Sequence, residues 1–427
     1  MNMAELETAE ALRALSMPMP TDRASWTRRR FLQASAATAG ATALLPSWLA
    51  DVAAAATPIG PTDGVLVIVL MAGGNDGLNT IVPIDDGRYF DARGPLAIGE
   101  NDALPVTTGI GLHPSLPKLA ARYKQGQVAL LRGVGDLTPD MSHFTAMARW
   151  MAATANGVHP TNGWLGRWLD GYAKADDLSA VVLGHAVPLA LIGDQRRATA
   201  LPVAGGDSLA VNTEPWVRRS LDCLRDFGAA PTGNGGFADM LGKASRTAVD
   251  LAGVVAPVYA KELPDDELPS QLELAARLIN ANLGLRVLHV EYGDFDHHAN
   301  QPAQHAARMT ELDAGIDRFF ATLSPTFARR TTIMTVSEFG RRPGANDSNG
   351  TDHGEASDLI VVGPGVKGGS YGEPVHLGHL SDHGCPIAHI DFRSVYATFL
   401  DSWLHADSKQ ILGAQYENLR FLKAPAL

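Results

Sequence analysis

A continuous apolar run at residues 64–70, GVLVIVL, constrains the fold of this chain more than any other feature. Its β-branched residues are typical of a strand that is buried on both faces of a parallel sheet. The run leads into a glycine-rich loop at residues 72–77. A strand of this kind needs helices on both faces of its sheet to cover it.

Similar apolar runs recur along the chain, and helical patterns separate them. We predict an α/β fold with a mostly parallel central sheet and helices on both faces. Helical spacing predicts helices at His113–Tyr123, Leu272–Leu283, Gln304–Leu323 and Ser394–Leu404. The other candidate strands are Gln127–Leu131, Ala180–Leu183, Leu189–Ile192, Arg286–Val290, Thr331–Val336 and Asp358–Val362.

The segment at about 195–264 differs from the rest, because it is turn-rich at first, then helical, and shows no clear strand. We interpret it as a mostly helical insertion that covers one rim of the sheet. Residues 57–427 then form a single α/β domain that contains this insertion.

Residues 1–56 have the pattern of a twin-arginine export signal. The stretch TRRRFLQ at 27–33 is followed by a short Ala- and Thr-rich run at 34–45 and by small residues at 53–56. The alternative is a basic turn before an ordinary alanine-rich helix. We expect the twin-arginine export machinery as a partner, a periplasmic or extracellular location, and no transmembrane segment in the mature chain.

Composition narrows the class of partner and the redox chemistry. The formal net charge of -11 argues against nucleic acid as a partner. The two cysteines, Cys223 and Cys385, have no C-x-x-C spacing, so they indicate no zinc knuckle or redox motif. A disulfide between them stays open.

Polar residues gather where the predicted strands end, which is where ligands bind in open α/β sheets. Each cluster also has a plain structural interpretation: a helix N-cap for Asp76 and for Ser142, a salt bridge for Glu338, and a solvated turn for Asp352 and His353. The clusters are Asp76 with Asn79, Ser142 with His143, Asp294 with Asp296, His297 and His298, Glu338 with Arg341, and Asp352 with His353.

Taken together, carboxylates and imidazoles arrive from several strand ends. This mixture of oxygen and nitrogen ligands suits zinc or manganese better than calcium, which prefers oxygen alone. Ionisable groups as dense as those of 294–298 repel one another unless a cation or water organises them.

Several motifs resemble an exported bacterial family, the domain of unknown function numbered 1501. The match covers essentially the whole mature chain in order. The motifs are GGNDGLNTIVP at 73–83, Ser142-His143-Phe144, NGWLGR at 162–167, DHHANQ at 296–301, SEFGR at 337–341, GTDHG at 350–354 and DFRSVYA at 391–397.

That family resembles the alkaline phosphatase and sulfatase superfamily. The resemblance implies two divalent metals, zinc or manganese, at the carboxyl end of the sheet and a nucleophile at a helix N-terminus. It assigns Ser142 as the nucleophile, with His143 or Arg341 to hold the non-bridging oxygens of the substrate. The implied metal ligands are Asp76, Asp296, His298, Asp352 and His353.

Two departures from the family pattern leave alternatives open. His297 stands where the family has Thr, and Asp294 stands where it has Gly, so an Asp294/His298 pair rivals Asp296/His298. A last histidine ligand is not fixed by a motif. The candidates are His379, His383 and His389.

The resemblance implies hydrolysis of a phosphate or sulfate ester, from a small molecule or a polymer. A second hypothesis is a non-catalytic secreted protein for binding or assembly, stabilised by a metal on the same fold. A nicotinamide enzyme is disfavoured, because the loop at 73–77 lacks the G-x-G-x-x-G spacing.

Overall fold

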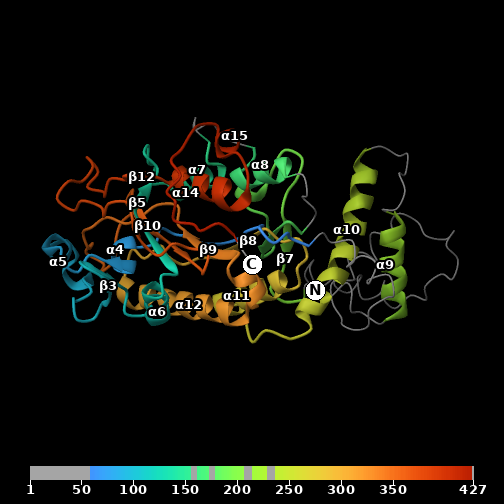
Figure 1. Ribbon diagram of the computed structural model, residues 1–427, viewed down its shortest axis with the longest axis horizontal. Helices are drawn as coiled ribbons and strands as arrows, with labels where there is room; N and C mark the ends of the chain where they lie inside the picture. The colour runs from blue at the N-terminus through green and yellow to red at the C-terminus, as the bar shows by residue number, and fades with distance from the viewer. Residues whose placement is uncertain (1–57, 155–160, 173–177, 206–213, 228–235, 426–427) are drawn as a thin grey trace, which may run out of the picture. The chain divides into compact units, whose positions relative to one another are not determined.

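The computed structural model describes residues 58–154, 161–172, 178–205, 214–227 and 236–425. They fall into two compact units, one of residues 57–203 with 263–427 and one that includes residues 204–262 (Figure 1). The predicted leader lies outside the described residues. Among the described helices, none is long and apolar enough to span a membrane.

The larger unit is built on a nine-stranded sheet in the order β11-β5-β10-β9-β1-β8-β6-β7, with β12 paired to β5. Every strand pair in it is parallel except the two that involve β10. The predicted mostly parallel α/β fold is confirmed. The strands are β1 (Val65–Met71), β5 (Val128–Gly135), β6 (Ala180–Leu183), β7 (Thr199–Leu201), β8 (Val287–Tyr292), β9 (Thr331–Val336), β10 (Ser357–Val362), β11 (Gly369–Tyr371) and β12 (Ile390–Asp391).

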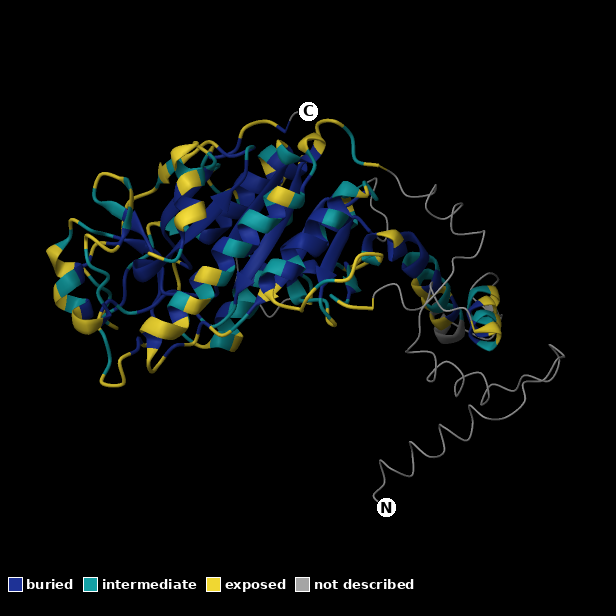
Figure 2. Cartoon of the chain, turned by 90° about the horizontal axis from the view of Figure 1, so that it is seen from below, coloured by how far each residue is buried: buried dark blue, intermediate teal, exposed yellow. Residues whose placement is uncertain are grey.

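Helices cover both faces of this sheet, and its strands are almost wholly buried (Figures 1 and 2). One face carries α6 (Pro117–Lys124), α11 (Leu268–Asn280) and α12 (Gln301–Thr322). The other carries α7 (His143–Ala152), α8 (Trp164–Gly171) and α14 (Phe392–Phe399), which continues into the π-helical turn η4 (Leu400–Leu404).

Stacked aromatic rings fix the helices on this second face. Trp150 of α7 stacks on Phe392 with ring centroids 4.4 Å apart, and Trp164 of α8 stacks on Tyr396 at 4.2 Å. All four side chains are buried in one core cluster. Each aromatic pair adds roughly 0.5–1.5 kcal/mol to the stabilisation from burial alone, so α7 and α8 are held firmly against α14.

The structure also contains a small antiparallel sheet that the sequence did not predict, with the strand order β2-β4-β3. It follows the short helix that begins directly after the glycine-rich loop. The remaining elements are α4 (Gly77–Thr80), β2 (Ile81–Val82), α5 (Gly87–Arg93), η2 (Gly94–Leu96), β3 (Leu104–Thr107), β4 (Ile110–Leu112), α13 (Pro325–Ala328) and α15 (Ser408–Leu412).

One predicted strand is wrong. Leu189–Ile192 forms the 3-10 turn η3 (Leu189–Leu191) instead. Its backbone packs directly on α8, because a Cβ atom at Gly163 would lie 2.1 Å from the carbonyl oxygen of Leu189. The run is therefore apolar because a helix covers it, and burial alone does not distinguish that environment from a sheet.

The smaller unit contains α9 (Pro215–Phe227) and α10 (Gly236–Tyr259), which pack on each other. Val217 and Leu221 of α9 form a small core with Val249 of α10. The segment predicted as a mostly helical insertion also includes β7 at its start. This three-residue strand is too short to give a recognisable alternation in sequence.

Candidate metal centre

The direction of β10 brings the candidate residues to one edge of the sheet. The loops after β1, β5, β8 and β9 leave at the carboxyl edge. Because β10 runs antiparallel to them, the segment that precedes it also lies there, and Ser357 pairs with Val134 near the end of β5. Arg341, just after β9, forms an antiparallel bridge with His353, just before β10.

Two glycines let these loops come close together. Gly73 and Gly74 follow β1 with φ of 117° and 81°, a region that favours glycine. A Cβ atom at Gly73 would lie 2.6 Å from the backbone nitrogen of Asp296. The β1 and β8 loops therefore meet backbone to backbone.

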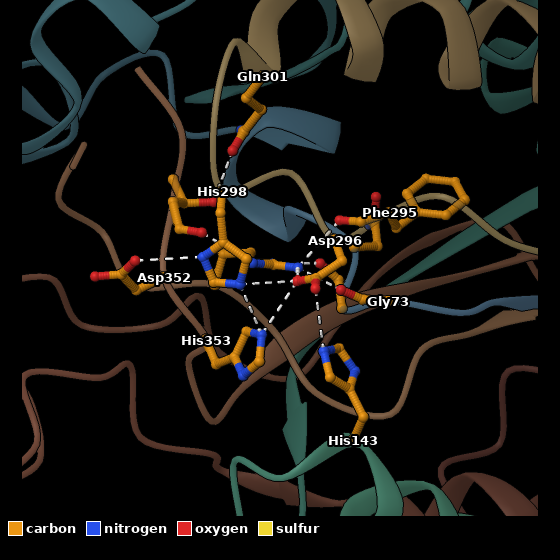
Figure 3. A network of polar contacts seen from close by, with 12 residues as sticks. Gly73, His143, Phe295, Asp296, His298, Gln301, Asp352 and His353 are labelled. Atoms are coloured by element: carbon orange, nitrogen blue, oxygen red, sulfur yellow. Dashed lines mark hydrogen bonds and ion pairs between the residues drawn. The ribbon is translucent and has the colours of Figure 1, made fainter. Parts of the chain in front are cut away.

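His143, Asp296 and His353 form a group that could hold a metal ion. One ligand atom from each lies within 4.8 Å of the others. The Nε2 atom of His298 joins them, at 3.0 Å from Nε2 of His353 and 3.0 Å from Oδ1 of Asp296 (Figure 3). We call these four residues the metal group.

The Nδ1 atom of each imidazole faces an oxygen. His143 Nδ1 donates to Glu338 at 2.8 Å, and His353 Nδ1 donates to the carbonyl of Met141 at 2.9 Å. His298 Nδ1 lies 3.4 Å from Asp352. In a neutral imidazole an N–H at Nδ1 leaves a lone pair at Nε2, which is the nitrogen that each of the three rings turns toward Asp296.

Asp296 is held as an anion. Partial burial acts to raise its pKa, but the hydrogen bond and charge of Arg341, with smaller effects from His353 and His298, lower the pKa to about 2. Oδ1 lies 2.6 Å from Nη2 of Arg341 and 3.1 Å from Nε2 of His353. Asp296 therefore offers a charged oxygen near neutral pH.

The donor set fits a divalent cation. Nε2 of His143 is buried and makes no hydrogen bond, although Oδ2 of Asp296 lies 3.4 Å away. Nε2 of His298 and of His353 face each other at 3.0 Å, so two lone pairs would repel without a proton or cation near them. Three nitrogen ligands with one carboxylate suit zinc or manganese better than calcium.

The structure also shows where the alternative ligands that the sequence left open lie. Asp296, and not Asp294, lies against His298. His297 is buried and faces Phe295 and His305. Among the described residues, the group within 4.8 Å includes none of the three C-terminal candidates, His379, His383 and His389. Cys385 is a free, buried thiol.

Asp352 is at the exposed rim. Its carboxylate accepts a hydrogen bond from Asn346 at 3.2 Å and approaches Nδ1 of His298, and both contacts lower the pKa of Asp352. It therefore lies against an imidazole of the metal group, and its predicted role as a direct ligand stays a prediction.

Asp76 does not join the metal group. It caps α4, and its buried carboxylate forms an ion pair of 2.6 Å with the buried Arg93. The side-chain amide of Gln301 donates to its other oxygen. Since these partners occupy both oxygens, the predicted metal ligand is an internal anion with its own counter-charge.

Arg341 braces the loops around the metal group. Its guanidinium is buried and donates to Asp296 and to four backbone carbonyl oxygens, and its predicted role toward substrate oxygens stays a prediction. It positions the loops that carry the metal group. The four carbonyls are those of Gly73, Gly74, Phe295 and Thr351.

Ser142 stands at the N-cap position of α7, but its side chain makes no capping hydrogen bond. Its backbone N–H donates to Asp140 at 2.8 Å, and the residue is exposed. Ser142 therefore does not cap α7 through its side chain, which was the structural alternative for this residue.

Glu338 has a role that the sequence did not reveal. It was interpreted as a salt-bridge partner of an arginine, yet it accepts from His143 and from the backbone N–H of Gly73. Its carboxylate is 1% exposed. The sequence signal for this role was the position of Glu338 directly after a buried strand. Its partner in the metal group is His143, which was predicted to hold substrate oxygens.

Comparison with known proteins places the chain beside one family. A model of a family described as "Protein of unknown function (DUF1501)" matches residues 128–402. No curated protein matches the chain.

Several solved structures are similar at low identity. A protein in the alkaline phosphatase superfamily from Vibrio parahaemolyticus is 9% identical, covering 82% of this chain and 72% of that chain, with a TM-score of 0.31. The PsFucS1 sulfatase from Pseudoalteromonas sp. is 12% identical, with coverage of 87% and 73% and a TM-score of 0.35. The soluble domain of lipooligosaccharide phosphoethanolamine transferase A from Neisseria meningitidis is 10% identical, with coverage of 72% and 79% and a TM-score of 0.34. With TM-scores below 0.5, these similarities carry no conclusion about activity.

Replacing Arg341 by Lys should lower the free energy of unfolding by about 3 kcal/mol, because one ammonium cannot reach five acceptors and leaves buried carbonyls unpaired. Chemical denaturation measures the change. The control is Arg88→Lys, in an ion pair whose arginine is 53% exposed, which should leave the free energy of unfolding nearly unchanged. Equal losses in the two variants would contradict a bracing role for Arg341.

Proposed function

The chain belongs to the DUF1501 family, as predicted, and we propose that it is a divalent-metal-dependent hydrolase of phosphate or sulfate esters. One observation carries the proposal: three imidazole Nε2 atoms and the Asp296 carboxylate converge at the carboxyl edge of the sheet. Several imidazole nitrogens beside a carboxylate favour the binding of a cation.

The geometry favours one ion, where two were predicted. His143, Asp296, His298 and His353 would hold it. Asp76, one of the predicted ligands, lies outside this group, and Arg93 already balances its charge. A second cation would have to displace a buried guanidinium, which would then lack a counter-charge.

When bound, the ion would polarise the ester's phosphoryl or sulfuryl oxygen and offset its developing charge. The chain's own residues do the rest. Glu338 and the carbonyl of Met141 keep protons on Nδ1 of His143 and His353, and Arg341 keeps Asp296 charged.

Ser142 is the proposed nucleophile. It precedes His143 and lies at the N-terminus of the ten-residue helix α7, where the helix dipole favours negative charge. Its Oγ would bond to phosphorus or sulfur while the bond to the leaving oxygen breaks, and the proton of the serine hydroxyl would leave with the alcohol. Water would then cleave the Ser142 ester and release the acid.

Purified wild-type protein should contain about one divalent ion per chain, and His353→Ala should lose it, because the variant removes an Nε2 ligand. Elemental mass spectrometry measures the content. His185→Ala is the matched control, since His185 is exposed and lies outside the metal group. Wild-type protein that stays metal-free after incubation with zinc and with manganese would refute the proposal.

Ser142→Ala should reduce the turnover of an aryl phosphate or sulfate by at least about a hundredfold while the metal content stays unchanged. The free energy of unfolding should change by less than about 0.5 kcal/mol, since the side chain makes no cap bond. Ser370→Ala, at an exposed position of β11, is the control. Full turnover in Ser142→Ala would favour the non-catalytic alternative or another nucleophile.

We also propose that the protein is exported by the twin-arginine route to the periplasm or beyond. The support is the sequence TRRRFLQ at 27–33 with its short apolar run. Replacing Arg28, Arg29 and Arg30 together by Lys should keep the protein in the cytoplasmic fraction, whereas a Lys124→Arg control should be exported. Unchanged export of the triple variant, measured by cell fractionation and immunoblotting, would overturn this proposal.

A further inference from the structure

Helix α7 has two apolar faces: one is buried in the core, and the other packs on the core only through Met147 and Met151, which are half-buried. Ala146 and Trp150 are buried against the sheet and α14. A second face carries apolar residues at the helical spacing i, i+3, i+4 and i+7, which in most surface helices would be polar. These residues are Phe144, Met147, Ala148 and Met151.

The second face lines a shallow pocket of about 510 Å³ that is open to solvent. Leu189 of η3 lies on its wall, together with backbone from the β1 and β8 loops. His143 and Glu338 line it as well. The pocket therefore borders the metal group, because His143 belongs to both.

Phe144 is the clearest sign that the pocket is built for an apolar group. Its side chain is 90% exposed, more than any other large hydrophobic residue in the described part of the chain. Packing within the chain does not explain a phenylalanine there, and an exposed apolar surface next to a reactive site is typical of a binding site.

The charges in the lining restrict the occupant further. Glu338 is committed to His143 and Gly73, and Asp294 is an exposed anion that also lines the pocket. Both repel a second negative group. The anionic head of an ester would lie toward the metal group, and the part inside the pocket would be neutral.

We infer that this pocket binds a neutral aromatic group of the substrate, so that the enzyme prefers aryl esters. The inference rests on the proposed function for its reacting end. An aromatic ring can pack against the ring of Phe144, and the thioethers of Met147 and Met151 favour contact with ring edges.

The experiment compares two non-hydrolysable ligands that share one anionic head. Isothermal titration of the zinc-loaded protein should show that phenylphosphonate binds roughly tenfold or more tightly than methylphosphonate. Phe144→Ser and Met147→Gln should each bring the ratio of the two dissociation constants to within about twofold of one. Since Phe144 is exposed, its variant should fold normally. Leu137→Ala removes a side chain that is 56% exposed and lies outside the pocket lining, so it should preserve the ratio.

A second arm separates the pocket from the metal chemistry. The neutral aromatic dye N-phenyl-1-naphthylamine should bind the metal-free protein, and Phe144→Ser and Met147→Gln should weaken that binding at least about threefold. If no metal binds but the dye behaves as described, the proposed hydrolase fails and the aromatic pocket stands. If phosphonates bind with no preference for phenyl, or if the variants leave dye binding unchanged, the aromatic pocket is refuted and the hydrolase stands.

Discussion

The arrangement at the carboxyl edge of the sheet depends on the guanidinium of Arg341. It comes from the loop after β9 and bonds to the loops after β1 and β8 and to the segment before β10. A buried carbonyl without a partner costs about 1–3 kcal/mol, so one side chain removes a large penalty from four loop carbonyls. Because the carboxylate of Asp296 is its fifth acceptor, the group that joins the loops also sets the position and charge of one metal ligand.

When its imidazoles are neutral, the side chains around the metal group carry a net negative charge. Three carboxylates, those of Asp296, Asp352 and Glu338, contact its imidazoles, and Arg341 is the cation that contacts one of them. With the imidazoles neutral, this leaves two negative charges, which one divalent ion would offset. The interior pair of Asp76 and Arg93 is neutral by itself. Of the carboxylates predicted as metal ligands, Asp76 thus belongs to an internal structural pair, whereas Asp296 and Asp352 lie at an outer site suited to one ion.

The sequence predicted the parts of the structure that depend on periodic burial. The runs at Ala180–Leu183 and Thr331–Val336 are β6 and β9 as predicted, since strands covered on both faces show their burial directly. Strand direction is not encoded in such a run, so the sequence could not show that β10 is antiparallel. The motifs located His298, Asp296 and His353 at the site, but not the partners that separate Asp76 from it. Arg93 and Gln301 become neighbours of Asp76 only through tertiary packing.

At the start of α7, three successive side chains face three different environments. Successive residues of a helix point about 100° apart, so His143 faces Glu338 and Asp296 while Phe144 lines the apolar pocket and Ser142 remains exposed at the N-cap. Of these three side chains, only His143 ties the helix to another element, through its bond to Glu338. The stacking of Trp150 on Phe392 further along α7 anchors the helix in the core. Because the anchoring residue lies in the core and the reactive residues lie at the free end, substitutions at the site can change its chemistry without loosening the fold.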